Sequence, residues 1–162
     1  MAASKNKDQT ALGALLSLLD IEQLEVNLFR GSTQQSGLIR VYGGQVLAQS
    51  LVAAQRTVSE PRAMHSMHAY FLLAGDPKIP IIYEVERVRD GGSFTTRRVK
   101  AVQHGQAIFV MSISFQKEEV SFDHQAEMPK VPGPDQLPSD VELRTKLAAS
   151  LPENMRSYLL RD

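Results

Sequence analysis

The sequence predicts an α+β fold in which a strongly twisted antiparallel sheet wraps round one long central helix. Residues 43–56 form a nearly unbroken stretch of small and aliphatic residues, typical of a helix that needs apolar cover on several sides. From residue 64 onward, apolar and polar residues alternate, and short turns separate the runs. The strands that follow do not alternate with helices, as they would in a fold with a parallel sheet. A single curled sheet that packs around the helix is therefore the simplest way to bury it.

Before the central helix, the pattern predicts one shorter helix and one strand. Leucines recur at helical spacing within residues 12–19, and the Thr10 hydroxyl is suited to cap the first turn. Across residues 21–31 the apolar residues alternate with polar ones, which indicates a single strand. The central helix then ends near Arg56, before a Ser-Glu-Pro sequence that interrupts regular structure.

After the central helix, four runs with a period of two predict four strands. They cover residues 64–73, 81–88, 94–103 and 106–116. Turn sequences rich in glycine, proline and aspartate separate them, such as the Asp-Gly-Gly-Ser of residues 90–93. Strands joined by such short turns form an antiparallel meander.

The predicted domain organisation has four parts. We expect a flexible N-terminus at residues 1–9, one domain at 10–118, a proline-rich linker at 119–138 and a helical C-terminal extension at 139–162. Ser139 is the expected cap of the helix in that extension.

Composition excludes several classes of protein. The 162 residues carry 18 basic and 18 acidic side chains, so no net field attracts nucleic acid or an anionic membrane. The chain has no cysteine, which excludes disulfides, thiolate zinc sites and a cysteine nucleophile. The apolar runs are too short to span a membrane and the start has no signal-peptide core, so we expect a cytoplasmic protein.

Two adjacent glycines, Gly43 and Gly44, open the predicted central helix, and Gln45 follows them. Neither Gly-x-Gly-x-x-Gly nor Gly-Lys-Ser/Thr is present, so the pair does not match a nucleotide phosphate loop. Backbone that turns tightly and packs closely on the sheet is the favoured interpretation. A helix start still offers unpaired N–H groups, which with the Gln45 amide are candidates to polarise a carbonyl or hold an anion.

Two histidines, His65 and His68, stand three residues apart in a predicted strand, hence on opposite faces, where they cannot share a metal ion. His65 shares a face with Met67 and Phe71 in this interpretation, which predicts a buried, hydrogen-bonded histidine. The alternative is a general base at the sheet edge beside the helix start. No other group of residues suggests a metal site.

A basic cluster, Arg97 and Arg98 with Lys100, falls on the third of the four predicted strands. A solvated face is the ordinary explanation of such a cluster. The alternative is a patch that receives the phosphates of a carrier such as coenzyme A.

Several of these motifs together resemble the TesB-type acyl-CoA thioesterase II family. They are the stretches VYGGQVLAQSLVAAQ, MHSMHAYFLLAGDP, GGSFTTRRVKAVQHGQAIFVMSISFQ and FDHQAEMP, in this order. The resemblance implies a hotdog fold, which is an antiparallel sheet wrapped round one long helix. It also implies hydrolysis of fatty acyl-CoA to free acid and coenzyme A by activated water, with no metal and no cofactor.

The resemblance covers the first of the two hotdog repeats that family members carry, together with the linker. The family's catalytic Asp, Thr or Ser, and Gln belong to the second repeat, so no catalytic residue is assigned in this chain. The central helix offers Gln45, Gln49 and Ser50 instead of an Asp. The helix start and the strand with His65 and Tyr70 are expected to line the acyl tunnel or the contact between repeats.

Three interpretations follow from the resemblance. The chain is the N-terminal half of a thioesterase and inactive alone, or a half-length protein that pairs with itself or with a separate second hotdog domain. Alternatively, it is a non-catalytic module for acyl-CoA binding or assembly. An unpaired sheet edge favours a neighbour, so a homo-oligomer is expected. A hotdog dehydratase is a more distant alternative, because the helix lacks the acidic residue that this chemistry needs.

Overall fold

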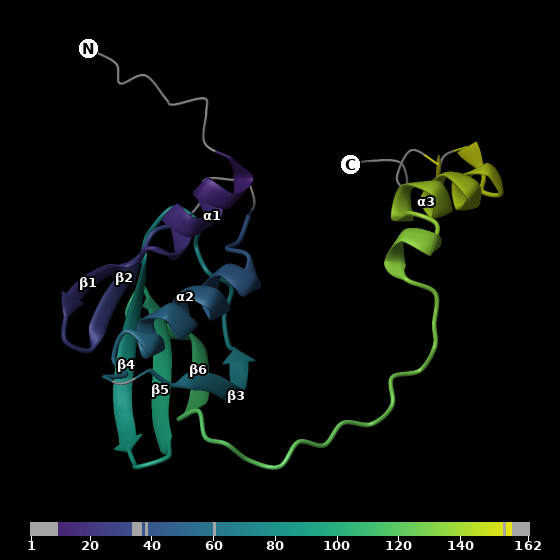
Figure 1. The fold of residues 1–162 in the computed structure, drawn as a ribbon. Coiled ribbons are helices and arrows are strands. Elements are labelled where there is room, and N and C mark those ends of the chain that lie inside the picture. Colours follow the sequence, from purple (N-terminus) through teal and green to yellow (C-terminus); the bar gives the residue numbers. More distant parts are fainter. Residues whose placement is uncertain (1–9, 34–36, 38, 60, 154, 157–162) are drawn as a thin grey trace. The chain divides into compact units, whose positions relative to one another are not determined.

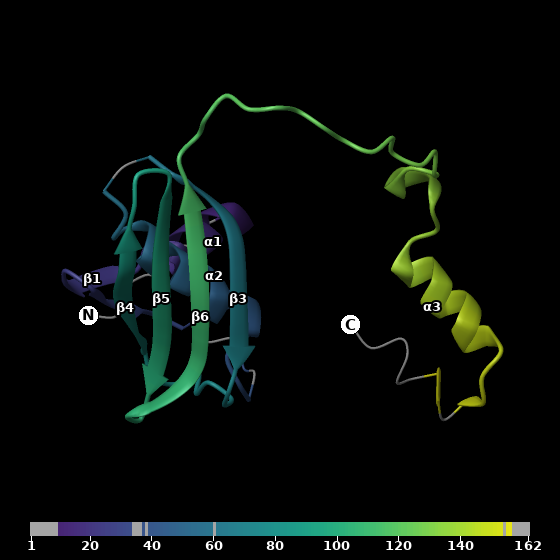
Figure 2. The ribbon, with the colours of Figure 1, turned by 90° about the horizontal axis from the view of Figure 1, so that it is seen from below.

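Helix α2 (Gly43–Gln55) lies across one face of a six-stranded sheet in the computed structural model (Figures 1 and 2). The structure describes residues 10–33, 37, 39–59, 61–153 and 155–156, and the predicted flexible N-terminus, residues 1–9, lies outside them. The chain divides into two compact units, one up to Val120 and the other from Ser121. Within the described residues, no helix is both long and apolar enough to cross a lipid bilayer.

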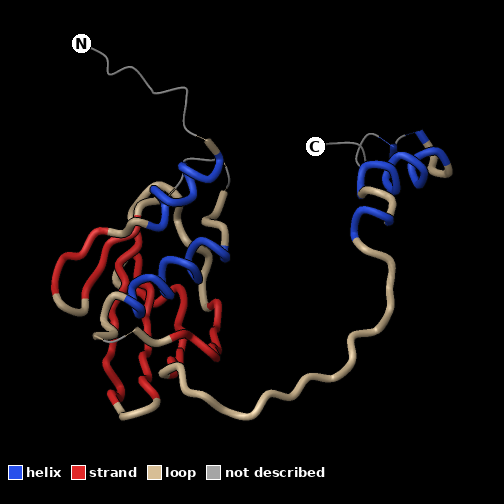
Figure 3. The backbone as a smooth tube through the Cα atoms, viewed as in Figure 1, coloured by secondary structure: helices blue, strands red, loops and turns tan. Residues whose placement is uncertain are grey.

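The sheet is antiparallel throughout, in the order β1-β2-β4-β5-β6-β3 (Figures 1 and 2). Figure 3 shows the strands in red and the helices in blue. Its strands are β1 (Glu22–Glu25), β2 (Leu28–Gly31), β3 (Ala63–Phe71), β4 (Ile81–Asp90), β5 (Phe94–Gln103) and β6 (Gln106–Gln116). Strands β4, β5 and β6 form a meander as predicted. The first of the four predicted strands was placed wrongly, because β3 pairs with β6 at the edge and not with β4. The predicted α+β fold with one central helix is confirmed.

The prediction of a single strand at residues 21–31 was wrong, because this stretch folds into the β1–β2 hairpin. The turn between the strands contains neither glycine nor proline, so the sequence carried only a weak turn signal there, a single asparagine. Asn27 in this turn is held by β4: its carbonyl accepts from Val85 N at 2.8 Å, and its side-chain oxygen accepts from Arg87 Nε at 2.8 Å. These two hydrogen bonds to β4, a strand far along the chain, hold the turn of the hairpin in place.

Helix α1 (Ala11–Leu19) begins at the predicted cap, where the Thr10 hydroxyl accepts a hydrogen bond from Gly13 N. The helix is apolar, yet it has no fully buried residue. Its C-terminal end is attached to α2, because Leu18 O accepts from Gln49 Nε2 at 2.7 Å and Asp20 pairs with Arg56 at 2.7 Å.

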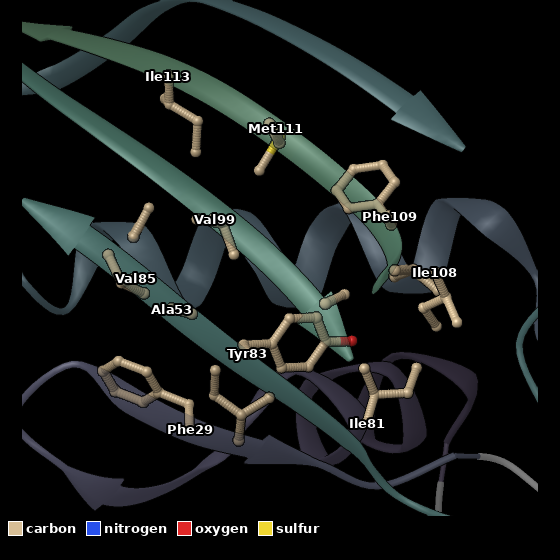
Figure 4. Packing of buried hydrophobic residues seen from close by; sticks show 14 of the residues in the cluster. Phe29, Ala53, Ile81, Tyr83, Val85, Val99, Ile108, Phe109, Met111 and Ile113 are labelled. Carbon is tan, nitrogen blue, oxygen red and sulfur yellow. The ribbon is translucent and has the colours of Figure 1, made fainter. Parts of the chain in front are cut away.

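The core lies between α2 and the sheet face that α2 covers (Figure 4). Strand residues on this face are large, whereas the helix presents small ones such as Ala53 and Ala54, so the two layers approach closely. The fully buried strand residues include Phe29, Ile81, Tyr83, Val99, Phe109, Met111, Ile113 and Phe115. On the opposite face, Lys100 pairs with Glu84 and Arg98 with Glu86, which is the predicted solvated surface.

The second unit contains a short 3₁₀ turn (Pro134–Gln136) and helix α3 (Asp140–Ala149). Helix α3 begins at the predicted cap Ser139, whose hydroxyl accepts from Glu142 N while the Glu142 carboxylate accepts from Ser139 N. The backbone N–H of Ser139, followed by its hydroxyl, lowers the pKa of Glu142. Residues 154 and 157–162 of the predicted extension lie outside the described residues.

Candidate functional site

The start of α2 presents polar backbone without a side-chain cap. Tyr42 occupies the N-cap position and makes no side-chain capping hydrogen bond, and the first turn has no acidic residue. Gln45 N and Val46 N both donate to Tyr42 O. The partial positive charge of this helix end is thus unopposed by any carboxylate in its own first turn.

Close packing accounts for the two glycines at this helix start. A Cβ atom on Gly43 would lie 2.8 Å from Cε1 of Phe71 at the end of β3. A Cβ atom on Gly44 would overlap the ring of Tyr42. The glycine pair therefore lets aromatic rings lie against the helix backbone, in agreement with the structural interpretation of the sequence.

Two cavities flank the start of α2. The first, about 670 Å³, lies between the helix start, the end of β3 with its following residues, and β6. Apolar side chains dominate its lining, including Val46, Phe71, Leu72 and Ile108. This volume is within the range of small-molecule pockets. Phe71 belongs to the strand expected to line an acyl tunnel, whereas the lining residues 72–75 were not predicted, although the apolar run AYFLLAG was a visible signal.

The second cavity, about 560 Å³, lies between α1 and the other side of the α2 start. Three leucines of α1, Leu15, Leu18 and Leu19, form one wall, and Ala48 of α2 lies in the opposite wall. Residues 40–42 line both cavities. The backbone that leads into α2 therefore separates two apolar spaces.

Gln45 lies at the second cavity, and its side-chain amide donates to Ser32 O at 3.1 Å. Gln49, one turn further along α2, is buried and fully engaged. It donates to Ser32 O at 3.0 Å and to Leu18 O at 2.7 Å, and it accepts from the Tyr83 hydroxyl at 2.6 Å. Burial raises the pKa of Tyr83, so this hydroxyl stays a donor. Gln49 therefore joins helix, hairpin and sheet instead of facing a ligand.

The predicted burial of His65 was wrong. A β-bulge between Met64 and Ser66 inserts one extra residue, which turns His65 away from the core face. The exposed His65 ring instead bonds Ser114 Oγ through Nε2 at 2.9 Å and contacts the Phe94 ring edge-on. The expected hydrogen bond is present, but on the face of the sheet opposite α2.

A hydrogen-bonded His–Ser pair is the arrangement that activates a serine nucleophile. Neither His65 nor Ser114 lines either cavity, however. Tyr70 also lies on the outer face, since it pairs with Val110 and its ring contacts His68. Of the β3 residues, Phe71 is the one that reaches the first cavity.

The basic cluster is not a single patch, because Arg97 and Arg98 point to opposite faces of β5. Arg97 is 1% exposed, and its guanidinium makes five hydrogen bonds within the chain. Three of these bonds go to Thr57 Oγ1 at 2.8 Å, Thr57 O at 3.0 Å and Asp90 Oδ1 at 2.6 Å. The other two go to backbone carbonyls of β4 and β5.

A guanidinium has five N–H donors, so Arg97 has none left for a phosphate. It connects the residues after α2 with the β4–β5 hairpin. Arg98 is exposed and paired with Glu86 at 3.3 Å on the outer face. Within the described part of the chain, no three His, Asp or Glu side chains gather as a metal ion would require.

The site thus brings together Gly43, Gly44 and Gln45 beside two apolar cavities, and it leaves out His65, Tyr70, Arg97 and Arg98. Chemically, it offers backbone N–H donors, an amide and space for an apolar chain. Helix α2 carries no carboxylate that could act as a general base.

Comparison with known proteins identifies the domain. The family model described as the acyl-CoA thioesterase N-terminal domain matches residues 30–116. Acyl-coenzyme A thioesterase 8 of Homo sapiens is 49% identical over 122 residues, which cover 75% of this chain and 38% of that protein. Acyl-CoA thioesterase 2 of Haemophilus influenzae is 44% identical over 142 residues, covering 88% of this chain and 50% of that protein. The chain therefore spans half or less of these relatives.

Solved structures agree with this match. The acyl-CoA thioesterase II TesB2 of Mycobacterium marinum is 52% identical, with a TM-score of 0.66, and the alignment covers 75% of this chain and 45% of that one. The tesB protein of Mycobacterium avium subspecies paratuberculosis is 33% identical, with a TM-score of 0.72, over 78% of this chain and 50% of that one. A protein described as having a hot dog fold, from Alicyclobacillus acidocaldarius, aligns at 22% identity with a TM-score of 0.66, over 77% of this chain and 48% of that one. The fold is the expected hotdog fold.

Proposed function

Because this chain belongs to the family of acyl-CoA thioesterase N-terminal domains, we propose that it forms one hotdog domain of an acyl-CoA thioesterase. The reaction is hydrolysis of a fatty acyl thioester to the free acid and coenzyme A. The observation that carries the proposal is the first cavity, an apolar space of about 670 Å³ that opens beside the uncapped start of α2.

In this proposal the fatty acyl chain occupies the first cavity. Val46, Phe71 and Ile108 supply apolar contact, and the backbone N–H of Gly43, which lines the same cavity, polarises the thioester carbonyl. Transfer of apolar surface from water into such a cavity favours binding by roughly 25 cal/mol per Å² buried. The domain thus binds and orients the acyl group, and the second hotdog domain supplies the base that activates water.

The binding partner is a second hotdog domain, from the same protein or from another copy. Among the residues that the structure describes, β3 is an edge strand with β6 as its one neighbour in the sheet. One of its sides therefore presents free backbone groups, next to the exposed side chains of Met67, Tyr70 and Phe71. Pairing along this edge would cover these groups and would bring a second domain beside the first cavity.

Filling the first cavity should weaken acyl-CoA binding. Ala74 lines this cavity, and Ala48 lines the second cavity, which makes Ala48 a matched control. We expect Ala74→Trp to weaken binding of a non-hydrolysable acyl-CoA analogue at least about tenfold by calorimetry, equal to about 1.4 kcal/mol. Ala48→Trp should leave the affinity close to wild type. The opposite result would place the acyl chain beside α1, and no binding by the wild-type chain would reject the proposal.

The chain alone should show little or no turnover of decanoyl-CoA, since α2 has no carboxylate to activate water. Release of free thiol measures this directly, and sedimentation of the same preparation reports whether the copies pair. Robust turnover would contradict the argument that this chain lacks a general base. Gln45→Ala and His65→Ala would then be the first variants to test. Binding without turnover, even after a second hotdog domain is added, would favour a non-catalytic acyl-CoA binding module.

A further inference from the structure

One loop forms a wall of both cavities. Residues 72–80 connect β3 to β4, and the part from 74 to 80 is called here the 74–80 loop. Ala74 and Gly75 line the first cavity, and Pro77 lines the second. The position of this loop therefore affects the shape of both apolar spaces.

Two side chains hold the 74–80 loop. The Thr33 hydroxyl donates to Pro77 O at 2.6 Å, and the buried Gln103, at the end of β5, makes the larger number of bonds. Gln103 is 4% exposed. Its amide oxygen accepts from Asp76 N at 2.8 Å, and its amide nitrogen donates to Asp76 O at 2.9 Å and to Ile79 O at 3.0 Å. A longer contact reaches Pro80 O at 3.4 Å. Both ends of the amide are thus engaged by loop backbone.

The loop in turn holds the backbone that leads into α2. Val41 N donates to Gly75 O at 2.9 Å. The packing is tight here, since a Cβ atom on Gly75 would lie 3.2 Å from Cβ of Val41 and 3.4 Å from Oε1 of Gln103. Val41 lies two residues before Gly43, and it lines both cavities.

We propose that Gln103 is a positioning residue for the start of α2, which it places by holding the 74–80 loop and, through Gly75, Val41. The proposal rests on the proposed function, because that function makes the helix start part of an acyl-CoA site. Gln103 itself lines neither cavity, so its effect on a ligand passes through the loop.

The chemistry of the amide explains why glutamine is needed. Its carbonyl accepts the Asp76 N–H while its NH₂ group donates to loop carbonyls. A glutamate of the same shape lacks these donors when ionised and would face carbonyl oxygens. A methionine of similar length neither donates nor accepts well.

Amide hydrogen exchange tests the proposal with Gln103→Glu and Gln103→Met, and with Gln106→Glu as an exposed control on the other side of the same turn. We expect the Val41 and Asp76 amides to exchange at least about tenfold faster in both Gln103 variants, which reports local opening of the loop. Core amides such as those of Val99 and Met111 should change no more than in the control.

Affinity for the acyl-CoA analogue should fall in the same two variants and persist in the control. Unchanged exchange at Val41, or equal acceleration at every amide, would overturn the positioning role. The two proposals fail separately: if the wild-type chain binds no analogue, the proposed function is rejected, whereas the exchange at Val41 still decides the role of Gln103.

Discussion

Replacing Arg97 by methionine is expected to lower the free energy of unfolding by about 1–3 kcal/mol for each buried acceptor that loses its donor. The substitution removes five hydrogen bonds from a side chain that is 1% exposed. It leaves Thr57 O and the Thr57 hydroxyl in a buried position without this donor. Urea unfolding followed by circular dichroism measures the change.

The neighbouring residue provides the control for this substitution. Arg98→Met removes a guanidinium from the same strand, but its ion pair with Glu86 spans 3.3 Å between exposed side chains. Exposed pairs contribute about 0–1 kcal/mol, so the stability should change little. Equal losses for both variants would show that Arg97 is not the buried link between α2 and the β4–β5 hairpin.

Replacing Gly31 by alanine is expected to destabilise the domain by about 1–3 kcal/mol, as overpacking of a dense core does. An added Cβ atom would overlap Oε1 of Gln49 and would lie 2.8 Å from Cε2 of Tyr83. Both side chains are fully buried and hydrogen-bonded to each other at 2.6 Å, so neither can move without breaking that bond. Chemical unfolding of the variant measures the loss.

Gly44→Ala is the matched control, since a Cβ atom there would also overlap a side chain. That side chain is Tyr42, which is 72% exposed and free to rotate toward solvent. Alanine also favours a helix more than glycine does, by about 1 kcal/mol. We therefore expect the stability of Gly44→Ala to remain near wild type; a loss as large as that of Gly31→Ala would contradict the argument.

Much of the fold was predictable because the signals are local. Thr10 and Ser139 cap helices as their hydroxyl chemistry suggests, and the four strands after residue 64 follow the period of two in their side chains. The β1–β2 hairpin was missed because its turn contains neither glycine nor proline, and the turn is held by Asn27 bonding to β4. That contact joins residues far apart in the chain, and no local pattern shows it.

The candidate site was predictable only in part. The helix start at Gly43, Gly44 and Gln45 was singled out because glycines before an apolar run stand out in a sequence, and its role as a binding site stays a prediction. Gln103 gave no comparable signal, since it is one polar residue at a strand end. Its importance depends on four contacts with a loop more than twenty residues away.

Periodicity and capping were enough to establish a sheet wrapped round one helix, because those signals act between residues a few positions apart. The sequence did not predict which face of the sheet each side chain occupies. One extra residue in β3 moved His65 to the outer face, and the end of α2 gave Arg97 buried partners that no charge pattern predicts. Both outcomes depend on contacts between distant segments, which form only once the sheet has closed over the helix.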